Sequence, residues 1–234
     1  MNQTELLKNL RKDAVRIFHE GLIPVEPRSA VSRYCRREGN TFYSLYKSFD
    51  LNSIRNIYVV GIGKAGAPMC EAVTDLLGDR ITEGLISVKY GHLGEIKNLE
   101  KFSVKIIEAG HPVPDENGQK AAEKIFEIAS RATDKDLVIC LISGGGSALA
   151  PFPVKGINLP DKQETINVLL SCGASIHEIN TIRKHTSGFK GGHLARAVYP
   201  ATLVALILSD VVGDDLDVIA SGPTVADNST YADC

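Results

Sequence analysis

The sequence lacks any apolar run long enough to cross a membrane. Its longest nearly apolar stretch, residues 201–208, is far shorter than the ~20 residues of a transmembrane helix. The first residues, MNQTELLKNLRKD, also lack the apolar segment of a secretory signal peptide. These absences predict a protein that does not bind membranes and has a cytoplasmic location.

Cysteine is scarce and scattered. Cys35, Cys70, Cys140, Cys172 and Cys234 are odd in number, lie far apart and include no Cys-x-x-Cys pair. This spacing fits neither a disulfide framework nor a zinc site. We therefore expect five reduced thiols.

An excess of basic charge is also missing. The 234 residues contain 26 Lys and Arg against 28 Asp and Glu, a formal net charge of -2. No nucleic-acid partner is expected without a net positive field. The charge is uneven, however, because no Lys or Arg follows Arg196 and six aspartates give the last 38 residues a charge of -6. Such an acidic end is typical of a solvated face or of a divalent-metal platform.

What the sequence does contain is an alternation of apolar runs and amphipathic segments. β-Branched apolar runs that end in Gly or Asp predict buried strands at 57–63, 84–91, 104–110, 136–146 and 201–213. Helix-forming segments fall at 65–77, 118–131, 161–170 and 190–198. The predicted fold class is therefore α/β, a Rossmann-like parallel sheet with helices on both faces, and residues 1–234 are expected to form one domain.

The first 50 residues are less regular. Apolar residues at helical spacing from Leu6 to Phe18 predict a first helix, with Thr4 as its N-cap and Gly21 as its stop. Residues 24–50 mix Pro, Arg, Ser and aromatic residues without a clean period. We expect a connector there, with one or two helical turns.

The first loop that suggests chemistry is Gly61-Ile62-Gly63-Lys64-Ala65-Gly66. It matches G-x-G-x-x-G, whose glycines allow the backbone to approach an anion at a helix N-terminus. The acid that would bind the ribose of a dinucleotide is missing, because the next predicted strand ends in Lys89 and Tyr90. Lys64 is placed to meet a carboxylate or a transferring phosphoryl group, and the structural alternative is a tight turn with an exposed lysine. The chain has no P-loop motif.

A second loop, Ser143-Gly144-Gly145-Gly146-Ser147-Ala148, follows another predicted strand. Its glycines expose backbone N–H groups and its serines add hydroxyl donors, which is typical of a phosphate-binding concavity. A glycine-rich surface turn is the alternative, but apolar residues flank this motif on both sides. We expect the segment from Ser143 to Ser147 to bind nucleotide phosphates.

Two further segments carry charged residues. They are the loop motifs Asn180-Thr181-Ile182-Arg183-Lys184-His185 with Lys190-Gly191-Gly192, and Ser209-Asp210-Val211-Val212-Gly213-Asp214-Asp215 with Ser221-Gly222-Pro223-Thr224. Arg183 and Lys190 are predicted to bind an anionic substrate. Asp210, at a strand end, is predicted to hold Mg²⁺ through one oxygen while water and phosphate complete the octahedron. The other aspartates here are more typical of turns and caps.

The histidines are assigned no chemistry. His111-Pro112-Val113-Pro114-Asp115 predicts a rigid extended turn before a helix, and a structural role is favoured because no carboxylate partner for His111 is evident. General-base catalysis by His111 is the alternative. Structural roles are likewise favoured for His185 and His193, with catalysis as the alternative.

Taken in order, these segments resemble the class II glycerate kinases, the D-glycerate 2-kinases whose older name is hydroxypyruvate reductase. The resemblance rests on residues 60–65, 110–115, 143–149, 180–185, 190–192, 209–214 and 221–224. It implies transfer of the γ-phosphoryl group of ATP to the 2-hydroxyl of D-glycerate, with Mg²⁺, in a cleft between two α/β domains. Lys64 looks like the family's essential lysine, and the SGGGSA loop looks like its nucleotide phosphate cradle.

Family members continue into a second α/β domain with a further catalytic arginine, and this chain does not contain it. We therefore expect residues 1–234 to be the N-terminal domain, with another domain or chain completing the cleft, and to have weak or no kinase activity alone. Two alternatives stay open. G-x-G-x-x-G favours an NAD(P)-dependent hydroxypyruvate reductase, a 2-hydroxy-acid dehydrogenase, and the short length favours an inactive nucleotide-binding remnant.

Overall fold

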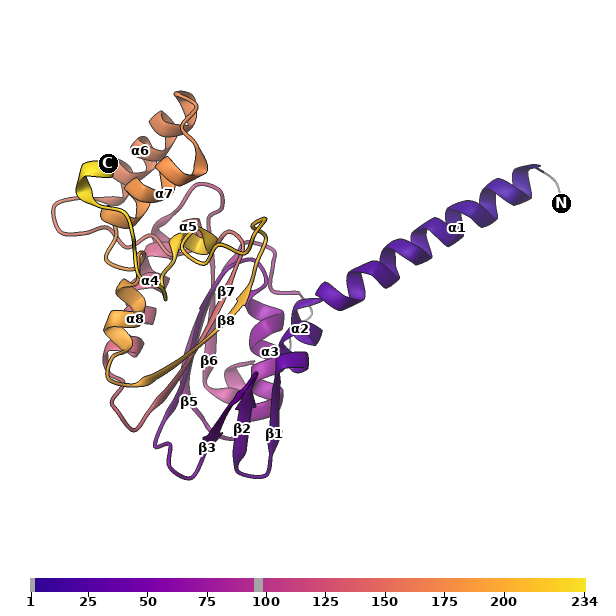
Figure 1. Ribbon diagram of the computed structural model, residues 1–234, viewed down its shortest axis with the longest axis horizontal. Helices are drawn as coiled ribbons and strands as arrows, with labels where there is room; N and C mark the ends of the chain where they lie inside the picture. The colour runs from indigo at the N-terminus through magenta and orange to yellow at the C-terminus, as the bar shows by residue number, and fades with distance from the viewer. Residues whose placement is uncertain (1–2, 95–98) are drawn as a thin grey trace.

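A five-stranded parallel sheet forms the centre of the computed structural model, which describes residues 3–94 and 99–234 (Figure 1). The strand order is β6-β5-β4-β7-β8. The strands are β4 (Ile57–Ile62), β5 (Ile81–Lys89), β6 (Val104–Ala109), β7 (Leu137–Ser143) and β8 (Thr202–Leu208). All five predicted strands are present, and the α/β class is confirmed.

Helices cover both faces of the sheet, as predicted. Helix α3 (Gly66–Leu77) packs on one face, and α4 (Glu116–Ser130) and α8 (His193–Val198) pack on the other. Alternate residues of β4 divide between the two cores: Val59 joins the cluster with α3, whereas Val60 joins the cluster with α4 and α8. A strand buried on both faces reads as the continuous apolar run that the sequence shows.

The strand order creates a switch point between β4 and β7. From β4 the chain adds β5 and β6 on one side, then returns to place β7 and β8 on the other. Open α/β sheets bind ligands at such a point, outside the carboxyl ends of the strands. The two glycine-rich motifs lie at the ends of β4 and β7, and the short helix α5 (Gly146–Leu149) begins within the second motif.

The prediction of a connector over residues 24–50 is wrong in its second half. Helix α2 (Pro27–Tyr34) supplies the helical turns, but β1 (Cys35–Glu38), β2 (Thr41–Ser44) and β3 (Lys47–Asp50) form a separate antiparallel sheet. Strands of four residues are too short for their alternation to stand out in a sequence. Burial of Phe42 against Phe49, with ring centroids 6.0 Å apart, gives the hairpins a core only in three dimensions.

Two helices lie above the carboxyl ends of the strands, α6 (Leu159–Ser171) and α7 (Ile176–His185). The prediction that 180–185 is a loop is wrong, because these residues form the second half of α7. Ser175 and Glu178 make the capping box that starts this helix, a signal that lies before the predicted motif.

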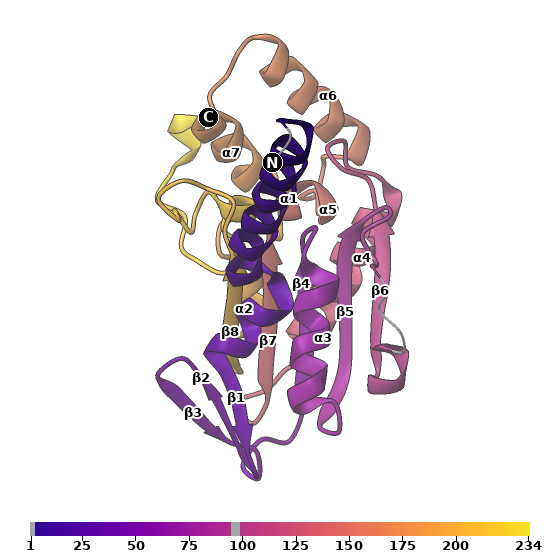
Figure 2. The same cartoon turned by 90° about the vertical axis from the view of Figure 1, so that its right-hand side faces the viewer.

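The first helix is confirmed and extends past Gly21. Helix α1 (Gln3–Leu22) projects from the domain with none of its residues buried (Figures 1 and 2). Short 3₁₀ helices complete the fold: η1 (Ile23–Val25), η2 (Leu99–Phe102), η3 (Ile219–Ser221) and η4 (Tyr231–Asp233). In the described ranges no helix has the length and apolarity to span a membrane.

Candidate active site

Hydrogen bonds join the two glycine-rich loops into one unit at the switch point. The backbone N–H of Lys64 donates to the Gly144 carbonyl at 3.0 Å, and that of Ala65 donates to Ser143 Oγ at 3.0 Å. A Cβ on Gly63 would overlap Ser143, and the φ of +131° at Gly63 suits only glycine. The glycines of the first loop therefore let it lie directly against the second.

The SGGGSA loop is covered by two basic side chains. Gly145 has a φ of +85°, and a Cβ there would lie 3.0 Å from both His111 Nε2 and Lys64 Cε. His111 follows β6, so residues from three loops meet over Gly145. Partial burial, together with the nearby charges of Lys64, Lys89 and His92, lowers the pKa of His111, although Asp210 acts in the opposite direction.

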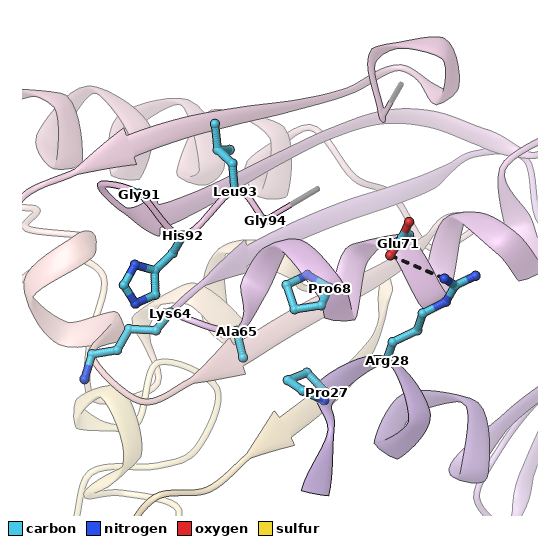
Figure 3. A pocket seen from close by; sticks show the side chains of 10 residues that line it. All are labelled: Pro27, Arg28, Lys64, Ala65, Pro68, Glu71, Gly91, His92, Leu93 and Gly94. Carbon is cyan, nitrogen blue, oxygen red and sulfur yellow. Dashed lines mark ion pairs between the residues drawn. The ribbon is translucent and has the colours of Figure 1, made fainter. Parts of the chain in front are cut away.

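The Lys64 ammonium has no hydrogen-bond or ion-pair partner among the described residues. Its side chain is only partly buried. Figure 3 shows it extending from the start of α3 beside His92, at one end of a pocket of about 670 Å³ that runs along α3 to Pro27 and Arg28. A free cation at the mouth of a pocket is suited to bind an anionic ligand.

Asp210 lies against the same loop. A Cβ on Gly144 would overlap the Asp210 carboxylate, which is exposed. No group of three or more His, Cys, Asp or Glu side chains in the described ranges is arranged to hold a metal. A single exposed carboxylate fits Mg²⁺, which keeps several waters and is held by one or two carboxylates plus substrate phosphates.

A chain of hydrogen bonds leads from the SGGGSA loop to α7. Ser147 Oγ lies 3.0 Å from Ser221 Oγ, and the Ser221 hydroxyl donates to Asn180 Oδ1 at 2.9 Å. Arg183 Nη1 donates to the same Asn180 oxygen at 3.4 Å. Ser221 and its neighbour Ala220 have φ of +60° and +52°, which is strained for residues with a Cβ and occurs mainly at functional sites.

Lys190 lies behind the loop. Its side chain is 2 % exposed, and its ammonium donates to the Ala150 carbonyl at 2.9 Å. Lys184, by contrast, pairs with Asp217 at 3.1 Å and Asp227 at 2.7 Å and thereby ties α7 to the C-terminal segment. His185 Nε2 lies 3.2 Å from Ser229 Oγ in the same segment.

The structure thus brings Lys64, Gly144, Gly145 and Asp210 together, while Arg183 and Lys190 lie on the far side of the loop. The segment from His111 to Asp115 is the expected turn, with Asp115 as N-cap of α4 at 2.9 Å from the Gly118 N–H. Sequence reasoning did not place the His111 imidazole beside Lys64, because only the alignment of β6 with β5 and β4 does so.

Comparison with known proteins identifies a family. Residues 13–234 match the model described as a domain of unknown function, DUF4147. The chain is 41% identical over 225 residues to a glycerate 2-kinase of Pyrococcus horikoshii, covering 96% of this chain and 49% of that one. It is 52% identical over 175 residues to a putative hydroxypyruvate reductase of Agrobacterium vitis, covering 75% of this chain and 39% of that one.

Solved structures agree with the sequence relatives. The crystal structure of a glycerate kinase from Thermotoga maritima superposes with a TM-score of 0.80 at 39% identity, over 97% of this chain and 50% of that one. The chain therefore spans about half the length of the relatives it matches.

Proposed function

We propose that this chain, which belongs to the DUF4147 family, forms the nucleotide-binding part of a glycerate 2-kinase active site. The reaction would transfer the γ-phosphoryl group of ATP to the 2-hydroxyl of D-glycerate. The observation that carries the proposal is the union of the GIGKAG and SGGGSA loops at the switch point, with Lys64, His111 and Asp210 around them. The names of the relatives support the same reaction.

The proposed roles follow from the chemistry of phosphoryl transfer, which depends on alignment and on neutralising the charge of the equatorial oxygens. The backbone N–H groups of residues 144–147 would hold the nucleotide phosphates. Lys64 would bind the substrate carboxylate or the transferring phosphoryl group, because its side chain lies over Gly145 and its ammonium has no partner in the described ranges. Asp210 would hold Mg²⁺, which supplies charge neutralisation when bound.

Arg183 and Lys190 would assist anion binding from the opposite side of the loop. Arg183 would act through the chain of hydrogen bonds that ends at Ser147, and Lys190 would act through its hydrogen bond to the Ala150 carbonyl, next to the loop. Residues 1–234 would form the N-terminal domain, and another domain or chain would supply the second wall of the cleft. The cytoplasmic location stays a prediction.

The dehydrogenase alternative is less well supported. Strand β5 ends at Lys89, which puts a cation where a dinucleotide-binding fold has its ribose-binding acid. The second glycine loop, moreover, has no role in that fingerprint. The name hydroxypyruvate reductase among the relatives keeps this alternative worth testing.

Calorimetric titration of the chain with a non-hydrolysable MgATP analogue, and separately with NADH, tests the proposal. We expect saturable binding of the ATP analogue and none of NADH. Gly144→Ala should weaken the binding about tenfold or more, because its Cβ displaces the Asp210 carboxylate. Gly21→Ala, on α1 with no atom near its Cβ, is the control. Binding of NADH, or unchanged affinity in Gly144→Ala, would contradict the proposed site.

A further inference from the structure

Three basic side chains are buried together beneath α6 and α7 without an acidic partner. Lys162 is 8 % exposed and Lys190 is 2 % exposed, and Arg183 is mostly buried beside them. None of the three forms an ion pair with any Asp or Glu of the described ranges. Lys184 on the same helix has two carboxylate partners, so acids are available nearby and pair with a different lysine.

Within residues 3–94 and 99–234, the hydrogen-bond acceptors of these cations are all neutral oxygen atoms. The Lys162 ammonium donates to the Thr186 carbonyl at 3.0 Å and to Thr186 Oγ1 at 2.9 Å. Lys190 donates to a carbonyl and Arg183 to an amide oxygen. Burying charge without a counter-charge is unfavourable, and burial with the charge of Arg183 lowers the pKa of Lys162 to about 8. The pKa of Lys190 falls well below its ordinary value for the same reasons.

A small cavity opens onto two of the three cations. It has a volume of about 240 Å³ and is lined by Lys162, Arg183, Thr186 and Thr165, and by the apolar side chains of Ile157, Ile166 and Ile182. Asp161 also lines it, but its carboxylate accepts the Asn158 N–H at 2.8 Å and caps α6. Pockets for drug-sized ligands span about 300–1,000 Å³, so this cavity suits a smaller group.

We propose that this cavity is an oxyanion pocket, in which Lys162 and Arg183 bind a carboxylate or an inorganic phosphate. An oxyanion there would supply a negative charge paired with these cations, which no carboxylate in the described part of the chain does. Arg183 is connected by hydrogen bonds through Asn180 and Ser221 to Ser147. An oxyanion bound to Arg183 would therefore affect the position of Ser147 in the SGGGSA loop. In this respect the inference rests on the proposed function and extends it to Lys162.

Calorimetric titration of the 234-residue chain with sulfate, whose charge is constant from pH 7 to pH 9.5, tests the oxyanion pocket. We expect saturable binding at pH 7, and about tenfold or more weaker binding in Lys162→Met. Lys155→Met, which removes an exposed lysine from the preceding loop, should bind as the wild type does. Absence of saturable binding to the wild type, or equal affinity in Lys162→Met, overturns the proposal.

Comparison of sulfate affinity at pH 7 and pH 9.5 tests the role of Lys162 even if Lys162→Met fails to fold. Deprotonation of Lys162 should weaken sulfate binding to the wild type between pH 7 and pH 9.5, since its pKa is about 8. Lys162→Arg keeps the charge at position 162 at pH 9.5, so this variant should lose less affinity than the wild type does between pH 7 and pH 9.5. The same loss in Lys162→Arg would contradict a role for Lys162.

Competition against bound sulfate identifies the source of the oxyanion. Displacement by D-glycerate points to the carboxylate of the acceptor, and displacement by inorganic phosphate alone points to free phosphate. Titration of the wild type with the MgATP analogue is scored separately. A chain that binds sulfate at Lys162 but no nucleotide keeps the oxyanion pocket and refutes the proposed function.

Discussion

At the scale of single residues, Lys64 is the side chain on which the proposed chemistry depends most. Lys64→Ala in an enzyme of the relatives' full length should lower turnover of D-glycerate by about a hundredfold or more, because a charge that stabilises the transition state is lost. The fold should survive, since the ammonium has no partner in the described ranges. Lys105→Ala, which removes an exposed lysine on β6, is the control. Near-normal turnover in a coupled assay would remove Lys64 from the site.

His111 shows what a sequence conceals at this scale. The two prolines that follow it, Pro112 and Pro114, and the N-cap at Asp115 predict the turn that the structure contains. Its position over Gly145 beside Lys64 depends on the distance between loops that are more than thirty residues apart in the chain. Lys162 is a similar case, because a lone lysine in an amphipathic helix predicts an exposed side chain, and this one is buried.

At the scale of elements, hydrogen bonds to Asp136 connect the amino ends of β4 and β7, the two strands on either side of the switch point. Asp136 precedes β7, and its buried carboxylate accepts from the Asn56 N–H at 3.1 Å, just before β4, and from the Thr133 N–H at 2.8 Å. Burial alone raises the pKa of Asp136, but hydrogen bonds from Thr133, Arg55 and Asn56 outweigh it and leave the pKa lowered.

Asp136→Asn should therefore reduce the free energy of unfolding by about 2–3 kcal/mol at pH 7, measured by urea denaturation. The stabilisation is present above the unfolded pKa of about 3.9 and is lost as the pH falls through the lower folded pKa. The difference between wild type and variant should consequently shrink at pH 3 and below. Asp134→Asn, which changes an exposed carboxylate in the same turn, should behave as the wild type does. A pH-independent difference would contradict the argument.

Elements with strong periodicity were predictable and weak ones were not. The five strands of the parallel sheet are apolar on both faces, so each reads as an apolar run regardless of its neighbours. The hairpins of β1 to β3 and the helix α7 are short and polar. The Phe42–Phe49 contact stabilises the hairpins, and the Lys184 ion pairs with Asp217 and Asp227 stabilise α7. Local preference alone is weak evidence in such segments.

At the scale of the whole molecule, the outer edge of β8 is apolar and open. A groove of about 970 Å³ runs along it, lined by the whole of β8, by α2 and by the β2–β3 hairpin. Unpaired apolar edges are normally covered. Since the relatives are about twice as long as this chain, we expect their remaining half to occupy the groove.

The 234-residue chain alone is therefore expected to phosphorylate D-glycerate weakly or not at all. Adding the remaining half of a relative, co-expressed and co-purified, should restore turnover, because it would supply the second wall of the cleft. Product formation with MgATP and D-glycerate measures both. Turnover by the chain alone at the rate of a full-length relative would show that the site is complete without that half.

The sequence by itself determined the fold class, the five-strand core, the two glycine-rich loops and the family resemblance, because each depends on residues that are close in the chain. Tertiary structure alone decided which side chains meet. It placed His111 over the SGGGSA loop, placed the Lys190 ammonium on the Ala150 carbonyl, and brought Lys162 and Arg183 to one cavity. These contacts depend on which side chains are buried and on the distances between segments that are remote in the chain. A local sequence pattern predicts neither.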